Sequence, residues 1–309
     1  MNFGLTEEQE MIVSTVRSFV ENEIYPHEDL VERSGEVPVE IANEIKRKTL
    51  ELGFYACNFP EEVGGAGLSH LDFALVEREL GRGSMALNHF FGRPQNILMA
   101  CEGEQRARYL LPAVRGERMD ALAMTEPEAG SDAASLRTTA RRDGDHYVIN
   151  GTKRYITNAP VAHTFNVMAR TDPEVKGARG ISSFIVERDT PGITLGSIDK
   201  KMGQSGSMTC DVIFEDVRVP AENIIGEEGE GFITAMKVLD RGRLHISGVS
   251  IGVAKRLIAD ALDYAMQRKQ FGQPIAEQQL IQAMLADSQT ETYAAECMTM
   301  ETARRRDRN

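Results

Sequence analysis

The sequence has 309 residues, with no tryptophan, four cysteines, six histidines and no long hydrophobic run. The cysteines form no CxxC pair, which disfavours a disulfide framework or a zinc site and favours buried thiols in a reducing compartment. The histidines show no metal-binding spacing. No apolar stretch approaches the roughly 18 residues that span a bilayer, and the acidic start lacks the hydrophobic segment of a signal peptide. We expect a cytoplasmic protein without a metal site or a membrane contact.

Positive charge is in the minority. Lysine and arginine total 35 against 47 aspartates and glutamates, a net charge of −12. Nucleic acid is disfavoured as a partner, because phosphate binding needs a basic face. The one basic cluster, at residues 304–308, is typical of a solvated helix end. The length predicts two domains, or three, at roughly 150 residues each.

Hydrophobic periodicity divides the chain into three segments. Residues 1–120 are predicted to be helical: Thr6 and Gln9 have the spacing of a capping box, and Pro26 is expected to end the first helix. A second helix is predicted from Val39 to Leu52. After the loop Pro60–Gly67, helical periodicity returns and ends at Gly81.

Residues 121–232 alternate with a period of two, which predicts short strands in an antiparallel barrel or sandwich. Asn150-Gly151 is expected to be a tight hairpin turn between two of them. The strands are expected at 147–149, 154–157, 165–169, 183–187, 192–195 and 211–217. Residues 233–309 return to helical patterns, from Phe232 to Met266 and from Ala276 to Arg304. The predicted fold is therefore α+β, with two helical domains around a β domain.

One segment, Ala123–Ser135, combines hydroxyl side chains with small residues in a short loop. Such a loop approaches a flat or anionic ligand closely and offers N–H and O–H donors. Taken alone, it is also typical of a turn that leads into a strand.

This segment resembles the first signature of the flavin-dependent acyl-CoA dehydrogenase family. Four further motifs follow the family's order: the Pro60–Gly67 loop, Tyr155–Asn158, Asp240–Arg243, and Arg268–Gly272 followed by Gln279. The resemblance implies FAD as the cofactor and an acyl-CoA thioester as the substrate. It also implies electron-transfer flavoprotein as the electron acceptor and a homo-oligomer, either a dimer or a tetramer.

The resemblance assigns the cofactor contacts. Thr125 would donate a hydrogen bond to the isoalloxazine ring, and Tyr155 would pack against it where many members have tryptophan. Thr157 would bond near flavin N5. The remaining predicted FAD contacts are Leu122, Met124, Gly130, Ser131 and Ile156, with Arg268, Phe271 and Gln279 reaching the FAD of a neighbouring subunit. Taken alone, Arg268 is typical of a solvated helix face and Phe271 of core packing.

The substrate contacts implied by the resemblance are Ser131, Asp240 and Arg243. Arg243 also suits an anionic ligand on physical grounds, as a fixed planar donor. His245, near Arg243, is expected to be a packed or capping residue and not a general base.

The implied reaction removes a proton from the α-carbon and passes a hydride from the β-carbon to flavin N5. It needs a buried carboxylate as the base. The family places this glutamate near the C-terminus or, in a minority, at the position matching Gly242, which has no side chain. We therefore expect the base beyond Asn309 and the chain to be truncated within a four-helix bundle. That would leave Leu280, Met284 and Leu285 without partners.

Two other functions fit the same motifs. An acyl-CoA oxidase or flavin-dependent monooxygenase on this scaffold would react rapidly with oxygen after reduction. A catalytically inactive partner subunit would keep the fold but not bleach its flavin with any thioester. Acyl chain length cannot be read from the sequence.

Overall fold

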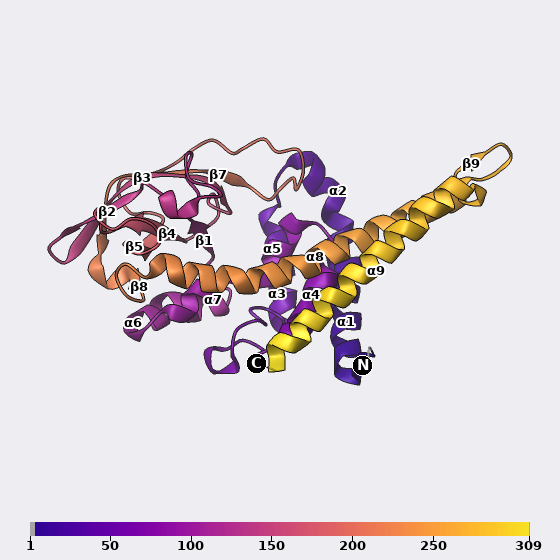
Figure 1. Ribbon diagram of the computed structural model, residues 1–309, viewed down its shortest axis with the longest axis horizontal. Coiled ribbons are helices and arrows are strands. Elements are labelled where there is room, and N and C mark those ends of the chain that lie inside the picture. Colours follow the sequence, from indigo (N-terminus) through magenta and orange to yellow (C-terminus); the bar gives the residue numbers. More distant parts are fainter. Residues whose placement is uncertain (1–3, 309) are drawn as a thin grey trace. The chain divides into compact units, whose positions relative to one another are not determined.

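The structure is a computed structural model that describes residues 4–308, with Arg241 described by its backbone alone (Figure 1). The chain forms two compact units. The first contains the residues up to Glu28, Leu68–Asn88 and the residues from Arg241 onward. The second contains Asp29–Gly67 and His89–Asp240. The three-domain division inferred from the sequence stays a prediction beside these two units.

The first unit is built of helices. Thr6 caps the first helix through the predicted capping box, in which Gln9 N donates to Thr6 Oγ1 over 3.2 Å and Thr6 N donates to Gln9 Oε1 over 3.1 Å. The helices are α1 (Glu7–Phe19), the π-helical turn η1 (Val20–Ile24), α2 (Tyr25–Ser34, shared with the second unit), α4 (His70–Leu80), most of α8 (Gly231–Gln267), and α9 (Gln279–Arg308).

The prediction that Pro26 ends the first helix is wrong. The helix continues from α1 through the π turn η1 into α2, where Pro26 is the second residue. Proline lacks an amide proton and its ring collides with the carbonyl four residues earlier. The wider π turn, which ends two residues before Pro26, relieves both constraints, so the chain stays helical.

Helices α8 and α9 are joined by a short β-hairpin of strands β9 (Lys269–Gln270) and β10 (Gln273–Pro274). Figure 1 shows the two helices, in orange and yellow, running side by side, and Lys255 of α8 forms an ion pair with Glu296 of α9. The turn residues Phe271 and Gly272 both have positive φ, 53° and 83°. This is the signature of a type I′ turn, which fits the twist of a two-residue hairpin.

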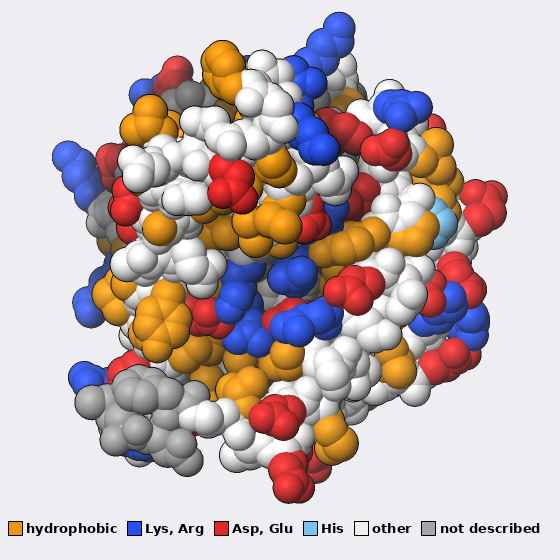
Figure 2. Space-filling view, turned by 90° about the vertical axis from the view of Figure 1, so that its right-hand side faces the viewer, with side chains coloured by type: hydrophobic (Ala, Val, Ile, Leu, Met, Phe, Trp, Pro, Cys, Tyr) orange, Lys and Arg blue, Asp and Glu red, His pale blue; other side chains and the backbone are white. Residues whose placement is uncertain are grey.

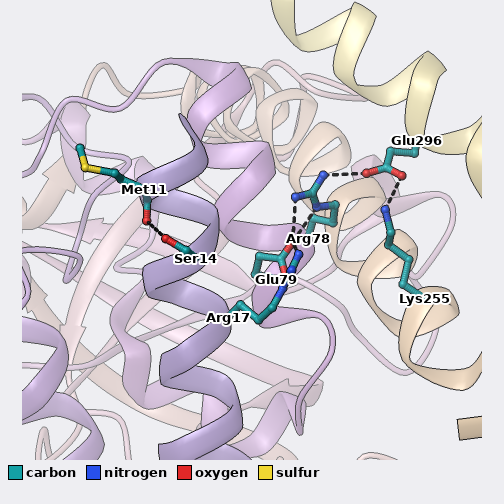
Figure 3. Close-up of polar contacts among 7 residues, drawn as sticks. All are labelled: Met11, Ser14, Arg17, Arg78, Glu79, Lys255 and Glu296. Carbon is teal, nitrogen blue, oxygen red and sulfur yellow. Dashed lines mark hydrogen bonds and ion pairs between the residues drawn. The ribbon is translucent and has the colours of Figure 1, made fainter. Parts of the chain in front are cut away.

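A chain of charged side chains connects four helices of the first unit (Figure 3). Arg17 of α1 pairs with Glu79 of α4 over 3.0 Å, and the neighbouring Arg78 also contacts Glu79. Arg78 then reaches Glu296 of α9 over 2.7 Å, and Glu296 pairs with Lys255 of α8 over 2.5 Å. The Glu79 side chain is 1% exposed and that of Arg78 9% exposed, so these are mostly desolvated contacts.

The second unit contains one eight-stranded sheet and short helices. The strands are β1 (Asp120–Ala123), β2 (Thr139–Asp143), β3 (His146–Thr157), β4 (Thr164–Arg170), β5 (Ile181–Glu187), β6 (Ile193–Leu195), β7 (Thr209–Pro220) and β8 (Ile224–Ile225). The helices are α3 (Val39–Glu51), α5 (Met85–Gly92, shared equally with the first unit), α6 (Gly103–Gln105) and α7 (Leu111–Val114). Short 3-10 turns lie at 61–63, 96–100, 133–135 and 221–223, and a π turn, η4, at Arg106–Leu110.

The sheet order is β6-β7-β3-β2-β4-β5-β8, with β1 attached to β4. Most pairs are antiparallel, as predicted, but β1 and β4 pair in parallel over four residues. Alternate residues of β4 enter different cores: Phe165 and Val167 join the core of the sheet, whereas Met168 joins a core with the helices of this unit. Both faces of β4 are therefore buried, and its residues from Thr164 to Ala169 are buried without a break.

The Asn150-Gly151 hairpin turn predicted from the sequence is wrong. The structure has a single strand, β3, that runs through both residues with a register shift against β7. Asn150 pairs with Asp216 on β7: its Nδ2 donates to Asp216 Oδ1 over 3.0 Å, and its Oδ1 accepts from Asp216 N over 2.9 Å. The Asn-Gly pair thus forms an irregularity within a strand pair, which local sequence does not distinguish from a turn.

Candidate flavin and acyl-CoA site

The loop after β1 is the centre of the predicted site. Thr125 follows the strand closely, and its carbonyl accepts a hydrogen bond from Arg154 N of β3 over 2.8 Å. Glu126 and Ala129 close the loop by two backbone hydrogen bonds of 3.0 and 3.2 Å. Beyond this closure, Gly130 and Ser131 are exposed. The loop is fixed at its base and open at its tip.

Tyr155 lies beside this loop in a left-handed backbone conformation, with φ of 58°. A β-bulge produces it, because Lys153 and Ile156 pair with Val212 and Cys210, so that the strand β3 carries an extra residue between these pairs. The bulge leaves the Tyr155 side chain 58% exposed, while Ile156 is buried. Left-handed backbone is uncommon for an aromatic residue and is often found at functional sites.

These residues fit a bound isoalloxazine ring. The exposed Tyr155 and Thr157 lie on β3, and the half-buried Thr125 lies on the loop that Arg154 N bonds to this strand. Together they offer a flat surface and hydroxyl donors, the groups that a flavin ring needs. Gly130 adds an open backbone position, because nothing lies within 4 Å of the point that a Cβ would occupy there, so a ligand can approach it. The side chains of Leu122 and Met124 lie in or against the hydrophobic core, so only backbone groups of these residues could contact a cofactor, and the Met124 carbonyl is already bonded to Lys153.

A buried ion pair supports the loop from inside the unit. Lys153 is fully buried, and its Nζ donates to Met124 O over 3.1 Å and to Glu126 Oε1 over 2.8 Å. Burial lowers the pKa of Lys153 to about 8, against the opposing effect of Glu126. Burial raises the pKa of Glu126, but Lys153 and hydrogen bonds outweigh it, so the net shift is downward. No motif or spacing in the sequence pointed to this pair.

The remaining predicted residues lie on α8, the hairpin and α9. Asp240 and Arg243 are exposed on α8, and Gln279 is exposed at the first residue of α9. Arg268 is exposed where α8 ends, and Phe271 is 95% exposed at the hairpin turn. Core packing of Phe271, which its residue type alone suggested, is therefore excluded in this chain.

Gly242 faces open space, because nothing lies within 4 Å of the position that a Cβ would take. No carboxylate therefore occupies the position that matches the alternative base. His245 packs edge-on against Phe73, with ring centroids 4.2 Å apart, and stacks on His70 at 6.5 Å. This agrees with a packed histidine.

A hollow of about 460 Å³ lies elsewhere on the second unit, beside the π turn η4. Its rim carries four glutamates, Glu102, Glu104, Glu222 and Glu227. An acidic rim repels an anionic ligand such as coenzyme A, and none of the motifs described above lies in it. We do not place the substrate there.

Metal clusters and membrane-spanning helices are absent from the described part of the chain. No group of three or more histidine, cysteine, aspartate or glutamate side chains there could hold a metal ion. None of its helices combines the length and apolar character that crossing a bilayer requires. All four cysteines are free, and Cys57, Cys101 and Cys210 are buried.

Comparison with known proteins identifies the family. The profiles for the acyl-CoA dehydrogenase N-terminal, middle and C-terminal domains match residues 6–117, 121–217 and 229–309. The chain is 38% identical to the human mitochondrial short-chain specific acyl-CoA dehydrogenase, over 98% of this chain and 74% of the relative. It is 40% identical to the caffeyl-CoA reductase-Etf complex subunit CarC of Acetobacterium woodii, over 96% of this chain and 76% of the relative.

The fold agrees with these matches. The structure of butyryl-CoA dehydrogenase from Megasphaera elsdenii superimposes with a TM-score of 0.90 at 34% identity, covering 100% of this chain and 82% of the other. The chain matches the family along its whole length. It carries the exposed Tyr155, the Thr125 loop, and Arg243 on α8. The chain belongs to the acyl-CoA dehydrogenase family of FAD-dependent oxidoreductases.

Proposed function

We propose that this chain binds the isoalloxazine ring of FAD between the Thr125 loop and Tyr155 and dehydrogenates an acyl-CoA thioester beside it. The single observation that supports this placement is the bulge that exposes Tyr155 next to the Thr125 loop, joined by the Arg154–Thr125 backbone hydrogen bond. FAD, when bound, accepts the hydride that leaves the β-carbon of the substrate.

The residues of the loop hold and polarise the cofactor. The Thr125 hydroxyl and the loop amides donate hydrogen bonds toward the ring and stabilise the negative charge that reduction brings. Tyr155 supplies a stacking surface, and Thr157 supplies a second hydroxyl on the same open edge. Leu122, Met124, Gly130 and Ile156 contribute backbone contacts to this site.

The substrate residues bind coenzyme A. Ser131 offers a hydroxyl at the open tip of the loop, and Arg243 offers a planar cation for an anionic group. Asp240 suits a hydroxyl or amide N–H of the pantetheine portion as a hydrogen-bond acceptor. The α-proton passes to a carboxylate base, and the double bond forms between the α- and β-carbons as the hydride leaves. Gly242 does not supply that carboxylate.

The hairpin residues suit contact with a second copy of the chain. Phe271 is almost fully exposed at the turn, with Arg268 and Gln279 on either side of the hairpin. We assign these three residues to the FAD of a neighbouring subunit in a homodimer or homotetramer. Electron-transfer flavoprotein is the proposed electron acceptor, in keeping with the relative from an Etf complex. Free cysteines are in keeping with a cytoplasmic location.

Anaerobic titration tests this function. Purified protein loaded with FAD is mixed with saturated acyl-CoA thioesters of increasing chain length, and absorbance is followed at about 450 nm, where oxidised flavin absorbs. Bleaching by at least one thioester is expected. Failure of the protein to retain FAD would contradict the proposed site. Rapid peroxide formation on admitting air would show an oxidase instead.

The open position at Gly242 favours one second candidate, an inactive partner subunit that binds FAD and acyl-CoA without a base. The variant Gly242→Glu separates the two. If the natural chain is inactive only because it lacks a base, a thioester will not bleach its bound flavin. The same thioester will then bleach the flavin of Gly242→Glu. Bleaching by the natural chain would exclude this candidate.

A further inference from the structure

We propose that Lys153, acting through Glu126, is a positioning residue for the cofactor: its buried ammonium group holds the Thr125 loop and the Tyr155 bulge in the arrangement that binds FAD. This inference rests on the proposed function, because it concerns the same flavin site. It adds a residue to which neither the motifs nor the comparisons assign a role.

The contacts of Lys153 converge on the base of the loop. Its Nζ reaches the carbonyl of Met124 on one side of Thr125 and the carboxylate of Glu126 on the other, over 3.1 and 2.8 Å. Arg154, the next residue of β3, holds the Thr125 carbonyl by its backbone N–H. Three consecutive loop residues are thus fixed by two consecutive strand residues.

Glu126 carries this restraint to the other end of the loop. Its Oε2 accepts from Arg137 N over 2.6 Å, and its Oε1 accepts from Thr138 N and Thr138 Oγ1 over 3.0 and 2.5 Å. These residues lead into strand β2. The Glu126 carboxylate therefore joins the start of the loop, where Glu126 lies, to the residues that follow the loop and to strand β3.

The same lysine is tied to the strained aromatic residue. In a regular strand Lys153 and Tyr155 would point to the same side, because side chains alternate with a period of two. The bulge between Lys153 and Ile156 breaks this alternation, so that Lys153 is fully buried while Tyr155 is exposed. Holding Lys153 inside helps to keep the Tyr155 ring at the open edge beside Thr125.

The pair is more consistent with positioning than with simple packing. An apolar side chain at residue 153 would fill the space but would leave the Met124 carbonyl without this donor. A buried carbonyl without a partner is costly, so the loop would rearrange to satisfy it. The loop geometry that remains would no longer be organised for the cofactor before it binds, which weakens binding.

The test measures FAD binding and the environment of the bound ring, not turnover. Apoprotein is titrated with FAD, and the dissociation constant and the residual fluorescence of the bound flavin, which a stacked tyrosine quenches, are recorded. For Lys153→Met we expect binding at least about tenfold weaker, equivalent to about 1.4 kcal/mol, and flavin fluorescence that is less quenched. Glu126→Gln is expected to change both in the same direction.

Lys46→Met is the matched control. Lys46 also donates from Nζ to a backbone carbonyl, that of Gly116, over 3.1 Å and within the same unit. It is expected to leave the FAD dissociation constant and the flavin fluorescence unchanged. Thermal unfolding of each apoprotein identifies variants that fail to fold. If Lys153→Met does not fold, the conclusion is drawn from Glu126→Gln.

Two failures are distinguishable. If the natural protein does not bind FAD, the proposed function is wrong. If the natural protein binds FAD, and folded Lys153→Met and Glu126→Gln bind it with the same affinity and the same fluorescence, the positioning role of Lys153 is wrong and the proposed function stands.

Discussion

At the scale of single residues, the site depends on conformations and charges that are costly in isolation. Tyr155 and Phe271 both adopt left-handed backbone, and both present an aromatic ring to solvent. Lys153 is a fully buried cation. A strained backbone conformation of this kind costs on the order of 1–3 kcal/mol and persists only where surrounding structure enforces it. Of the six non-glycine residues with positive φ in the described part of the chain, two, Tyr155 and Phe271, are assigned to cofactor binding.

Asp120 is a buried acid outside the site and gives a pH-dependent prediction. Burial raises its pKa to about 6, despite hydrogen bonds from Gln95 N and Asn166 Nδ2. The folded state therefore holds a proton that the unfolded chain releases. The contribution of Asp120 to the free energy of unfolding is fully present below pH about 4 and is lost between pH about 4 and 6. The loss amounts to roughly 2–3 kcal/mol.

The variant Asp120→Asn should lose this pH dependence. The Asn166 Oδ1 atom has no hydrogen-bond partner, so a turned Asn166 amide can accept from the new side-chain amide. Urea unfolding at pH 4 and pH 7 measures the effect: the difference in stability between variant and natural protein should shift by about 2–3 kcal/mol in favour of the variant at pH 7. The exposed Asp263→Asn serves as control. A constant difference at both pH values would contradict the assignment.

At the scale of elements, helices α4 and α8 pack with little space between their backbones. Gly248 and Gly252 of α8 lie against backbone atoms of α4 and the turn after it. A Cβ at residue 252 would lie 2.0 Å from the Arg78 carbonyl oxygen, and one at residue 248 would lie 2.9 Å from the Ala74 carbonyl oxygen. Glycine is therefore required at this crossing for steric reasons.

Gly252→Ala is predicted to lower the free energy of unfolding by about 3 kcal/mol, since backbone must move to admit the methyl group. Gly242→Ala on the same helix is the control, because its Cβ meets nothing within 4 Å. Alanine is the better helix former, so the control should gain about 0.5–1 kcal/mol. Chemical denaturation of both variants measures the difference. A similar effect of the two substitutions would show that the crossing is looser than described.

Glu296 contributes to the attachment of α9 to α4 and α8, because it accepts from Arg78 and from Lys255 (Figure 3). Glu296→Gln removes the negative charge between two cations and should cost about 3 kcal/mol. Glu301→Gln, on the same helix, breaks the solvent-screened pair with Arg305 and should cost much less. Hydrogen exchange along α9 would report the loosening. Equal protection in both variants would contradict a role for Glu296.

At the scale of the whole molecule, α8 and α9 expose many large apolar side chains. Leu280 is 77% exposed and Met284 64% exposed, as the sequence predicted for these residues, whereas Leu285 is half-buried. Further exposed members are Leu257, Leu262, Met266, Tyr293 and Met298. Hydrophobic side chains also reach the surface between charged ones in Figure 2. Exposed apolar surface of this extent is typical of an association surface.

We therefore predict self-association through α9. In sedimentation velocity, the natural chain should form a concentration-dependent multimer. The double variant Leu280→Glu/Met284→Glu should shift toward the monomer, because it places charges on the apolar surface. The control Val39→Glu/Leu50→Glu adds the same charge at exposed apolar residues of α3 and should not change the multimer. A monomeric natural chain would contradict the prediction.

Much of the fold and part of the site could be predicted from the sequence. The capping box at Thr6, the helix that ends at Gly81 and the strand at 165–169 depend on neighbours a few residues apart, and the structure confirms them. The Thr125 loop could likewise be predicted, because its small and hydroxyl residues are neighbours in the sequence. The parallel pairing of β1 with β4 was not visible, since it joins segments about 40 residues apart.

The sequence by itself determined the order of helical and strand segments, the family, and the residue types available to the flavin site, because hydrophobic period and motif spacing are properties of the chain. Only the tertiary structure decided that Pro26 stays within a helix, that Asn150 pairs with Asp216 inside a strand, and that Lys153 points inward while Tyr155 points out. These depend on a π turn, a cross-strand partner and a bulge. Each is set by contacts whose free energy exceeds the local preference of the residues.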